Sequence, residues 1–171
     1  MQIRDRIKEL RRVKASELKP SPRNWRSHPQ GQQDALRGVL AEIGYASALL
    51  AREGNGHLEL IDGHLRAETT PDQEVPVLIL DVTEEEADKI LATFDPLAAM
   101  AEANQEALGK LLADIDTDSD ALREMLDELA AENGIDSFEM PADADGKEFD
   151  ESCADDVEMM ECPSCGHKFP K

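Results

Sequence analysis

The sequence has few aromatic residues, few cysteines and no long hydrophobic run, and each shortage excludes a class of protein. Only 4% of the 171 residues are aromatic, so the core must be built from aliphatic side chains. Three cysteines are too few for a disulfide scaffold. No apolar run approaches the roughly 20 residues that cross a bilayer, and the charged N-terminal stretch differs from a signal peptide. We therefore expect a cytoplasmic protein without membrane association and with one modest core.

Positive charge is also scarce, and it is concentrated at the N-terminus. The chain has 18 basic and 38 acidic residues, a net charge of −20. Residues 1–26 hold nine basic against three acidic residues, a balance of +6, which leaves −26 for the rest of the chain. This polarity is typical of a protein that holds nucleic acid or phosphate at its basic end, or whose two ends clamp together, or simply of a soluble protein with a basic arm. We assign residues 1–12 to such an arm.

Hydrophobic periodicity and turn residues predict a small α/β domain followed by helices. Gly44 is expected to end the first amphipathic helix. A capping box formed by Thr83 and Glu86 opens a later helix, which Pro96 should close. The expected elements, in chain order, are a short charged helix (3–12), a helix (32–44), a strand hairpin (48–51 and 57–61), a third strand (75–82) and three further helices (83–94, 104–115 and 120–133).

The strongest local motif is the glycine turn over residues 62–66, between the second strand and a short helix. Gly63 allows a close approach of the backbone to a ligand, and the first helical N–H groups with the helix dipole offer an anion site. Arg66 lies one turn into the helix, where its guanidinium can bind phosphate oxygens, and His64 can donate a hydrogen bond or a proton. The alternative is purely structural, with Arg66 paired to a carboxylate such as Glu68 or Asp62.

The ordered segments LKPSPRNWRSHP, EIGY, LIDGHLRAE and VPVLILD together resemble the ParB/sulfiredoxin-like domain over residues 13–95. The resemblance implies an α/β (α+β) fold, a small mixed sheet flanked by helices, over residues 13–98. It also implies that Gly63, His64 and Arg66 form a phosphate-binding box. The proline-rich stretch from Pro22 to Arg26 matches the loop near the nucleotide in related proteins, and we expect Arg23 and Asn24 of this stretch at the site.

Several departures from the family pattern restrict what the resemblance implies. Chromosome-partitioning members bind CTP and carry Glu and Arg after the box glycine, whereas this chain has His64 and Leu65, as in ParB-like proteins of bacteriophages. The later Glu-Asn-x-Gln-Arg motif is absent, although Asp95 offers a carboxylate for Mg²⁺ beside a bound nucleoside triphosphate. Gly63 occupies the place of the reactive cysteine of sulfiredoxins, which argues against their chemistry.

The two helices over residues 99–134 occupy the place of the helix-turn-helix domain of partitioning proteins. The segment carries Lys110 and Arg123 against ten acidic residues, so it would be repelled from DNA. We therefore interpret this helical extension as a structural hairpin or as the interface of a homodimer.

Residues 135–160 are predicted to form an acidic disordered linker. Between residues 132 and 161 there are 12 acidic residues and one lysine, a composition that buries too little apolar surface to fold. Such a linker is suited to recruiting a protein partner. The alternative is a mimic of nucleic-acid charge that inhibits the basic N-terminal loop.

The tail over residues 161–171 contains a Cys-x-x-Cys-Gly motif of the kind found in zinc knuckles. The thiolates of Cys162 and Cys165 can reach one tetrahedral Zn²⁺ ion, which predicts a structural zinc site. Four ligands are required, however. Either Cys153 and His167 complete the site, or two chains each donate a cysteine pair, or the half-site is vestigial.

These observations together predict a ParB-like domain that binds a nucleotide or a nucleic-acid phosphate at the turn over residues 63–66. The process is expected to involve DNA, as in bacteriophage genome modification, partition or packaging. A first alternative is a metal-dependent nuclease or nucleotide hydrolase in which His64 and Asp95 are catalytic. A second is a non-catalytic adaptor that acts through the acidic linker and the zinc-knuckle tail.

Overall fold

A computed structural model describes residues 2–54, 56–135, 159–161 and 168–170. The chain divides into two compact units, Met1–Ser137 and Phe138–Lys171. None of the described helices is long and apolar enough to cross a membrane. The first unit contains β1 (Ile7–Lys14), a 3-10 helix (Ala15–Glu17), β2 (Leu18–Pro20), α1 (Gln30–Glu42), β3 (Leu49–Gly54), β4 (His57–Asp62), α2 (His64–Thr69), β5 (Glu74–Leu80), α3 (Glu84–Ala99), α4 (Gln105–Ala113) and α5 (Asp120–Glu132).

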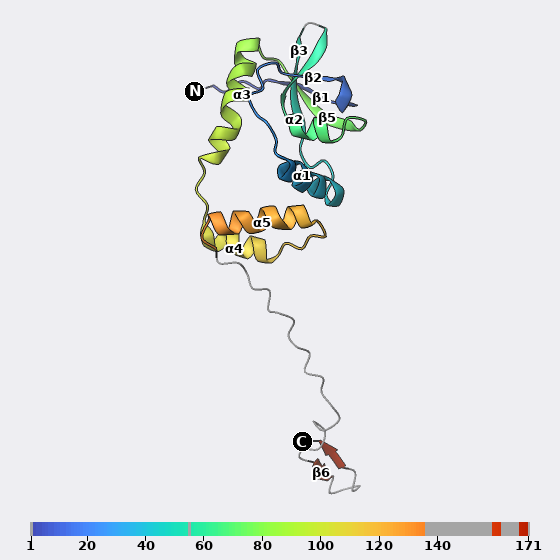
Figure 1. Ribbon diagram of the computed structural model, residues 1–171, viewed down its shortest axis with the longest axis vertical. Helices are drawn as coiled ribbons and strands as arrows, with labels where there is room; N and C mark the ends of the chain where they lie inside the picture. The colour runs from blue at the N-terminus through green and yellow to red at the C-terminus, as the bar shows by residue number, and fades with distance from the viewer. Residues whose placement is uncertain (1, 55, 136–158, 162–167, 171) are drawn as a thin grey trace. The chain divides into compact units, whose positions relative to one another are not determined.

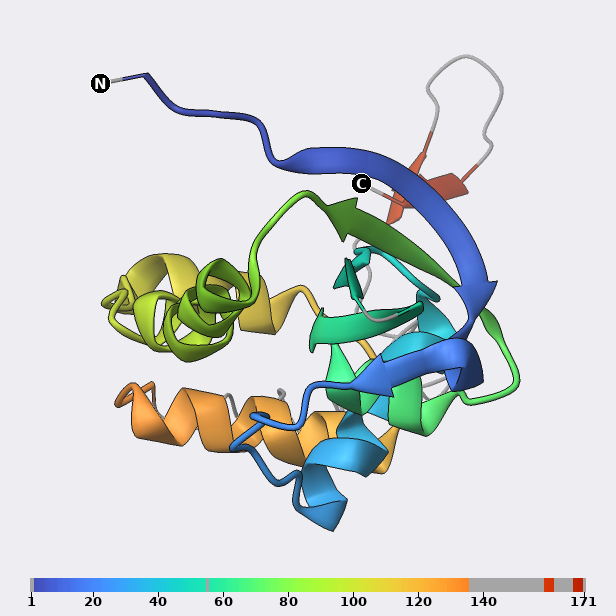
Figure 2. The same ribbon diagram turned by 90° about the horizontal axis from the view of Figure 1, so that it is seen from above.

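The first unit is built around one five-stranded mixed sheet with the strand order β1-β5-β3-β4-β2 (Figure 1). β3 and β4 form the predicted antiparallel hairpin, and β5 is the predicted third strand. β5 runs parallel to β3, and β2 runs parallel to β4. β1 pairs antiparallel with β5 and is the edge strand on that side of the sheet (Figure 2). The predicted fold class, a small mixed sheet flanked by helices, is confirmed.

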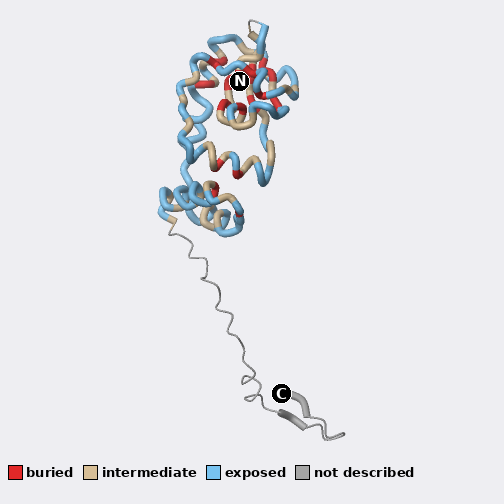
Figure 3. The backbone as a smooth tube through the Cα atoms, turned by 45° about the vertical axis from the view of Figure 1, so that its right-hand side comes forward, coloured by how far each residue is buried: buried red, intermediate tan, exposed pale blue. Residues whose placement is uncertain are grey.

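Aliphatic side chains fill a core on each face of the sheet. Leu60 and Ile61 are neighbours on β4 and point to opposite faces, as the alternation of a strand requires. Leu60 joins a cluster on the face that α2 covers, whereas Ile61 packs with Ala87 and Leu91 of α3. The buried residues are concentrated in the sheet, and α4 buries none of its own (Figure 3).

The helical extension packs on α1 rather than on the sheet. α1 contacts α5, and a Cβ atom added at Gly38 of α1 would lie 2.7 Å from the Cβ of Ser119, which is the N-cap of α5. Near the end of α1, the Thr117 hydroxyl donates a 2.6 Å hydrogen bond to the carboxylate of Glu42. Gly38 therefore allows the close helix contact that attaches the extension to the domain.

Two secondary-structure predictions are wrong. Residues 7–14 form a strand, β1, instead of part of a helix over 3–12. As an edge strand, β1 leaves Ile7 and Leu10 about half exposed, so its apolar residues lack the alternation that would reveal a strand. Pro96 lies inside α3, which continues to Ala99. The carbonyl of Ala92, which loses a hydrogen bond to this proline, belongs to an exposed residue and can bind water.

The second unit contains two short antiparallel strands, β6 (Met159–Glu161) and β7 (Lys168–Pro170). Met159 and Met160 lie in the range predicted for the disordered linker, but they belong to a strand and pair with Pro170 and Phe169. The remaining linker residues, 136–158, and the cysteines Cys162 and Cys165 lie outside the described residues. The acidic linker and the zinc knuckle therefore stay predictions.

Candidate functional site

The glycine turn joins β4, which ends at Asp62, to α2, which begins at His64. Gly63 adopts φ +93°, a left-handed conformation that strains other residues. A Cβ atom there would also lie 3.1 Å from the Arg66 Nη2 atom and 3.3 Å from the Leu49 Cβ atom. Glycine is thus required both by the turn and by the close packing of the two side chains beside it.

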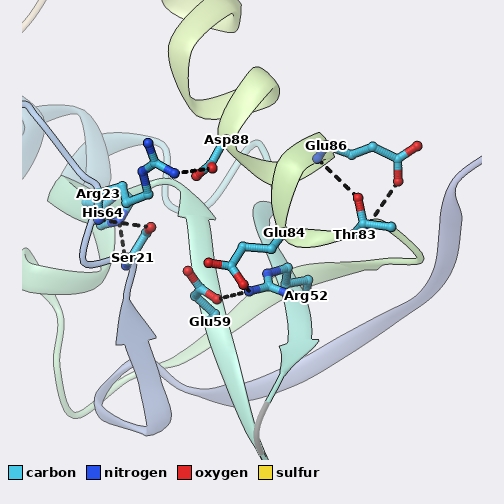
Figure 4. Close-up of polar contacts among 9 residues, drawn as sticks. All are labelled: Ser21, Arg23, Arg52, Glu59, His64, Thr83, Glu84, Glu86 and Asp88. Atoms are coloured by element: carbon cyan, nitrogen blue, oxygen red, sulfur yellow. Dashed lines mark hydrogen bonds and ion pairs between the residues drawn. The ribbon is translucent and has the colours of Figure 1, made fainter.

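His64 is buried and ties the turn to the proline-rich loop. The backbone N–H of Ser21 donates to His64 Nε2 at 3.3 Å and also to the carbonyl of Leu60 at 3.2 Å (Figure 4). Burial lowers the pKa of His64, although the nearby carboxylates of Glu68 and Asp62 oppose this effect. At neutral pH the ring is therefore uncharged, with Nε2 acting as an acceptor, and it positions the loop against the turn.

Arg66 extends from α2 back toward the end of β4. Its Nη2 atom lies 3.0 Å from Asp62 Oδ2, as the structural alternative anticipated, and its Nη1 atom donates to the hydroxyl of Ser47. The helix that carries it has only six residues, less than two turns, so its dipole is small. The expected contribution of a helix N-terminus is therefore minor, and the Arg66 guanidinium is the cation that this turn offers to an anion.

The proline-rich loop adds a second cation, Arg26, through two local turns. Asn24 donates its N–H to the carbonyl of Ser21 at 3.1 Å, and its side-chain oxygen accepts from the Arg26 N–H at 3.2 Å. The Arg26 guanidinium lies 4.4 Å from the ring centroid of Trp25, and its Nη1 atom is 2.5 Å from Asp95 Oδ2 on α3.

A pocket of about 210 Å³ brings these groups together. Five of the predicted site residues line it: Asn24, Gly63, His64, Arg66 and Asp95. Arg26, His28 and Asp62 also line the pocket, although the sequence analysis names none of them as a ligand-binding residue. The Asn24-x-Arg26 spacing was a usable signal for a fixed loop at Arg26, because in an Asx turn the asparagine side chain accepts a hydrogen bond from the backbone two residues on.

Arg23 does not reach this pocket. Its Nη1 atom lies 2.6 Å from Asp88 Oδ2 of α3, and the side chain lines a separate hollow beside the start of that helix (Figure 4). The Arg23 and Arg26 side chains therefore diverge, although both pair with a carboxylate on the same helix.

The pocket carries two carboxylates, Asp62 and Asp95, as candidate ligands for a divalent cation. Among the described residues, no three His, Cys, Asp or Glu side chains are grouped closely enough to hold a metal ion by themselves. Phosphate oxygens and water would therefore have to supply the remaining ligands of a Mg²⁺ ion bound here.

No protein-family model and no curated protein matches this sequence. Among solved structures, the chain is similar to the C-terminally truncated chromosome-partitioning protein ParB from Caulobacter crescentus in complex with CTP-γ-S, with 19% identity and a TM-score of 0.51. That match covers 62% of this chain and 63% of the ParB chain, less than two thirds of its length.

Two further solved structures are also similar to this chain. Sulfiredoxin from Arabidopsis thaliana is 18% identical with a TM-score of 0.40, over 48% of this chain and 97% of that one. A Pnob8-like ParB-N domain is 17% identical with a TM-score of 0.43, over 95% and 56% of the two chains. At these identities the similarity concerns the fold alone, and the described α/β unit has a fold similar to that of the truncated ParB protein.

Proposed function

We propose that this chain binds a nucleotide or a nucleic-acid phosphate in the pocket between Arg26 and Arg66. The observation that carries the proposal is the convergence of two guanidinium groups from separate segments, the loop before α1 and the turn after β4. A guanidinium group donates several N–H hydrogen bonds from one plane, in an arrangement that matches phosphate oxygens. Asn24 and His28 add polar side chains to the lining of the pocket.

The carboxylates of Asp62 and Asp95 are the partners that a phosphate must share or displace. Both ion pairs are partly open to water, with exposed fractions of 21% and 35% for Arg66 and Asp62, and of 23% and 57% for Arg26 and Asp95. Ion pairs at such positions contribute about 1 kcal/mol or less, so exchanging a carboxylate for a phosphate costs little. Mg²⁺ between phosphate and carboxylates would lower that cost further.

The similar fold of ParB, whose structure was determined with CTP-γ-S, supports a nucleoside triphosphate as the ligand class. A DNA-related process such as partition, packaging or genome modification in a bacteriophage is the wider role that we infer by analogy of fold. The structural zinc site, a homodimer and a protein partner for the acidic linker belong to the same proposal.

Calorimetric titration of the full chain with CTP, ATP and GTP, with and without Mg²⁺, tests the proposal. We expect saturable binding that Arg66→Ala weakens at least tenfold. Arg37→Ala is the matched control, because Arg37 is a half-exposed arginine on α1 that pairs with Asp34 outside the pocket. Absence of binding by folded protein, or equal losses in both variants, would overturn the proposal.

Measurement of nucleotide turnover in the same samples tests the hydrolase alternative. Magnesium-dependent turnover that His64→Ala abolishes would favour the hydrolase, for which the sequence predicts His64 and Asp95 as catalytic residues. Binding without turnover would identify a binding module.

A further inference from the structure

We propose that Trp25 is a stacking platform for a nucleobase whose phosphate occupies the pocket between Arg26 and Arg66. This inference rests on the proposed function and narrows its ligand to a base joined to phosphate. Free nucleotides and single-stranded nucleic acid share this chemistry.

Trp25 is exposed in a chain that has few aromatic residues. It is the only tryptophan in the sequence, and 63% of its surface remains accessible to water. A large aromatic side chain contributes most to stability when it is buried, yet the core excludes this one. An accessible indole beside a phosphate site is the arrangement that proteins use to stack bases.

The loop presents Trp25 in a defined place. Its two neighbours, Asn24 and Arg26, both line the pocket, and the hydrogen bond from the Arg26 N–H to Asn24 Oδ1 holds the backbone on either side of the tryptophan. Asp95 anchors the far end of the Arg26 side chain at 2.5 Å. The backbone at Trp25 is therefore held next to the pocket rather than on a freely moving loop.

Arg26 links the ring to the pocket. Its guanidinium lies 4.4 Å from the ring centroid of Trp25, within the range of a cation–π interaction. The same guanidinium carries N–H groups that can bind a phosphate. A ligand held by Arg26 through its phosphate is therefore brought directly beside the exposed indole.

The size of the pocket indicates that it holds the phosphate of the ligand but not the base. At about 210 Å³ it is smaller than the roughly 300 to 1,000 Å³ of sites that enclose a whole small-molecule ligand. The phosphate fits inside, whereas the base must lie outside, where Trp25 offers the accessible aromatic surface. Because stacking depends on the π-face that all bases share, we expect little preference among the four bases.

The test compares ligands with and without a base on the full-length protein. Inorganic tripolyphosphate, CTP, ATP and a short 5′-phosphorylated single-stranded oligonucleotide are titrated by calorimetry into the unaltered chain and into Trp25→Ala, Trp25→Phe and Leu111→Ala. Leu111 is an exposed side chain of α4 outside the pocket, and it controls for the loss of apolar surface.

In the unaltered chain we expect CTP and ATP to bind about tenfold more tightly than tripolyphosphate. Trp25→Ala should abolish this difference while leaving the affinity for tripolyphosphate within about twofold. Trp25→Phe should keep most of the difference between the affinities for nucleotides and for tripolyphosphate. Leu111→Ala should keep all of this difference. A stronger Trp25 effect on the oligonucleotide than on CTP would identify a strand as the ligand, and the reverse would identify a free nucleotide.

Equal affinities for tripolyphosphate and nucleotides, unchanged by Trp25→Ala, would overturn the stacking role and leave the phosphate site intact. Failure of every probe to bind folded protein would overturn the proposed function and the stacking role together. Stacking failure and site failure are therefore separable in one set of titrations.

Discussion

Two arginine–carboxylate arrangements in this protein have the same chemistry but different access to water. Arg52 on β3 pairs with Glu59 on β4 at 2.6 Å beneath the start of α3 (Figure 4). The Arg52 side chain is only 12% exposed and the Glu59 side chain only 15%. At the pocket, Arg66 pairs with Asp62 and Arg26 with Asp95, and each of these pairs has at least one third of its carboxylate exposed.

The difference teaches which ion pair is structural and which is available to a ligand. Separating the Arg52–Glu59 pair would leave a desolvated charge without its partner, which is costly. The pocket pairs are hydrated, so each guanidinium can exchange its carboxylate for a phosphate at small cost. Access to water, rather than residue type, therefore separates the two sets of arginines.

The largest expected effect comes from breaking the buried pair. Arg52→Met should lower the free energy of unfolding by about 3 kcal/mol, because Glu59 keeps its charge in a desolvated place. Urea denaturation measures this loss, and nucleotide affinity measured on the folded fraction should not change. A loss below about 1 kcal/mol would mean that the pair is as dispensable as one at the surface.

Removing a pocket arginine should weaken nucleotide binding strongly and change the stability of the fold only slightly. Arg66→Ala or Arg26→Ala should weaken nucleotide binding by about 2 kcal/mol, roughly thirtyfold, since each loses charge-assisted hydrogen bonds to phosphate. The free energy of unfolding should fall by less than about 1 kcal/mol. Titration and urea denaturation of the same preparations give both numbers. A variant that loses stability but keeps its affinity for the nucleotide would show that its arginine has a structural role, as Arg52 does.

Removing a competing carboxylate should strengthen binding. Asp95→Asn frees Arg26 from its 2.5 Å ion pair, so in the absence of Mg²⁺ the affinity for tripolyphosphate should rise by about 1 kcal/mol, roughly fivefold. Asp34→Asn frees the control residue Arg37 on α1 and should leave the affinity for tripolyphosphate unchanged. A gain that disappears or reverses with Mg²⁺ would show that Asp95 also helps to hold the cation.

The smallest effect concerns pH. Burial lowers the pKa of His64 from 6.5, while Glu68 and Asp62 raise it and His28 and Arg26 lower it. Between the folded pKa and 6.5 the unfolded chain binds more protons than the folded chain, so the free energy of unfolding should fall as pH drops through that window. His64→Gln keeps an acceptor for the Ser21 N–H and should flatten this part of the stability profile. An unchanged slope would assign it to other groups.

Much of the fold was predictable from local sequence, because each central element carries a strong signal. The alternation and glycine turn of β3 and β4, the helical spacing of α1 and the capping box of α3 all depend on residues close together in the chain. β1 was not predictable in this way, because an edge strand is specified by its partner β5. Its own residues alternate too weakly to distinguish a strand from a helix.

The centre of the candidate site was predictable from the sequence, whereas the arginine that the loop contributes was not. Gly63 and Arg66 were identifiable because their turn follows a strand directly and the motif is local. Arg23 and Arg26 lie three residues apart on the same loop, and only the three-dimensional placement of Asp88 and Asp95 on α3 determines which one faces the pocket. That placement depends on contacts across about 65 residues of chain, which local patterns do not encode.

The most direct test of the account follows the side-chain Nε–Hε signals of the arginines by NMR while tripolyphosphate is added to the full chain. We predict that the signals of Arg26 and Arg66 shift and saturate together, while those of Arg52 and the control Arg37 stay in place. Shifts confined to the basic N-terminal strand, or spread evenly over every exposed arginine, would contradict a specific phosphate site in this pocket.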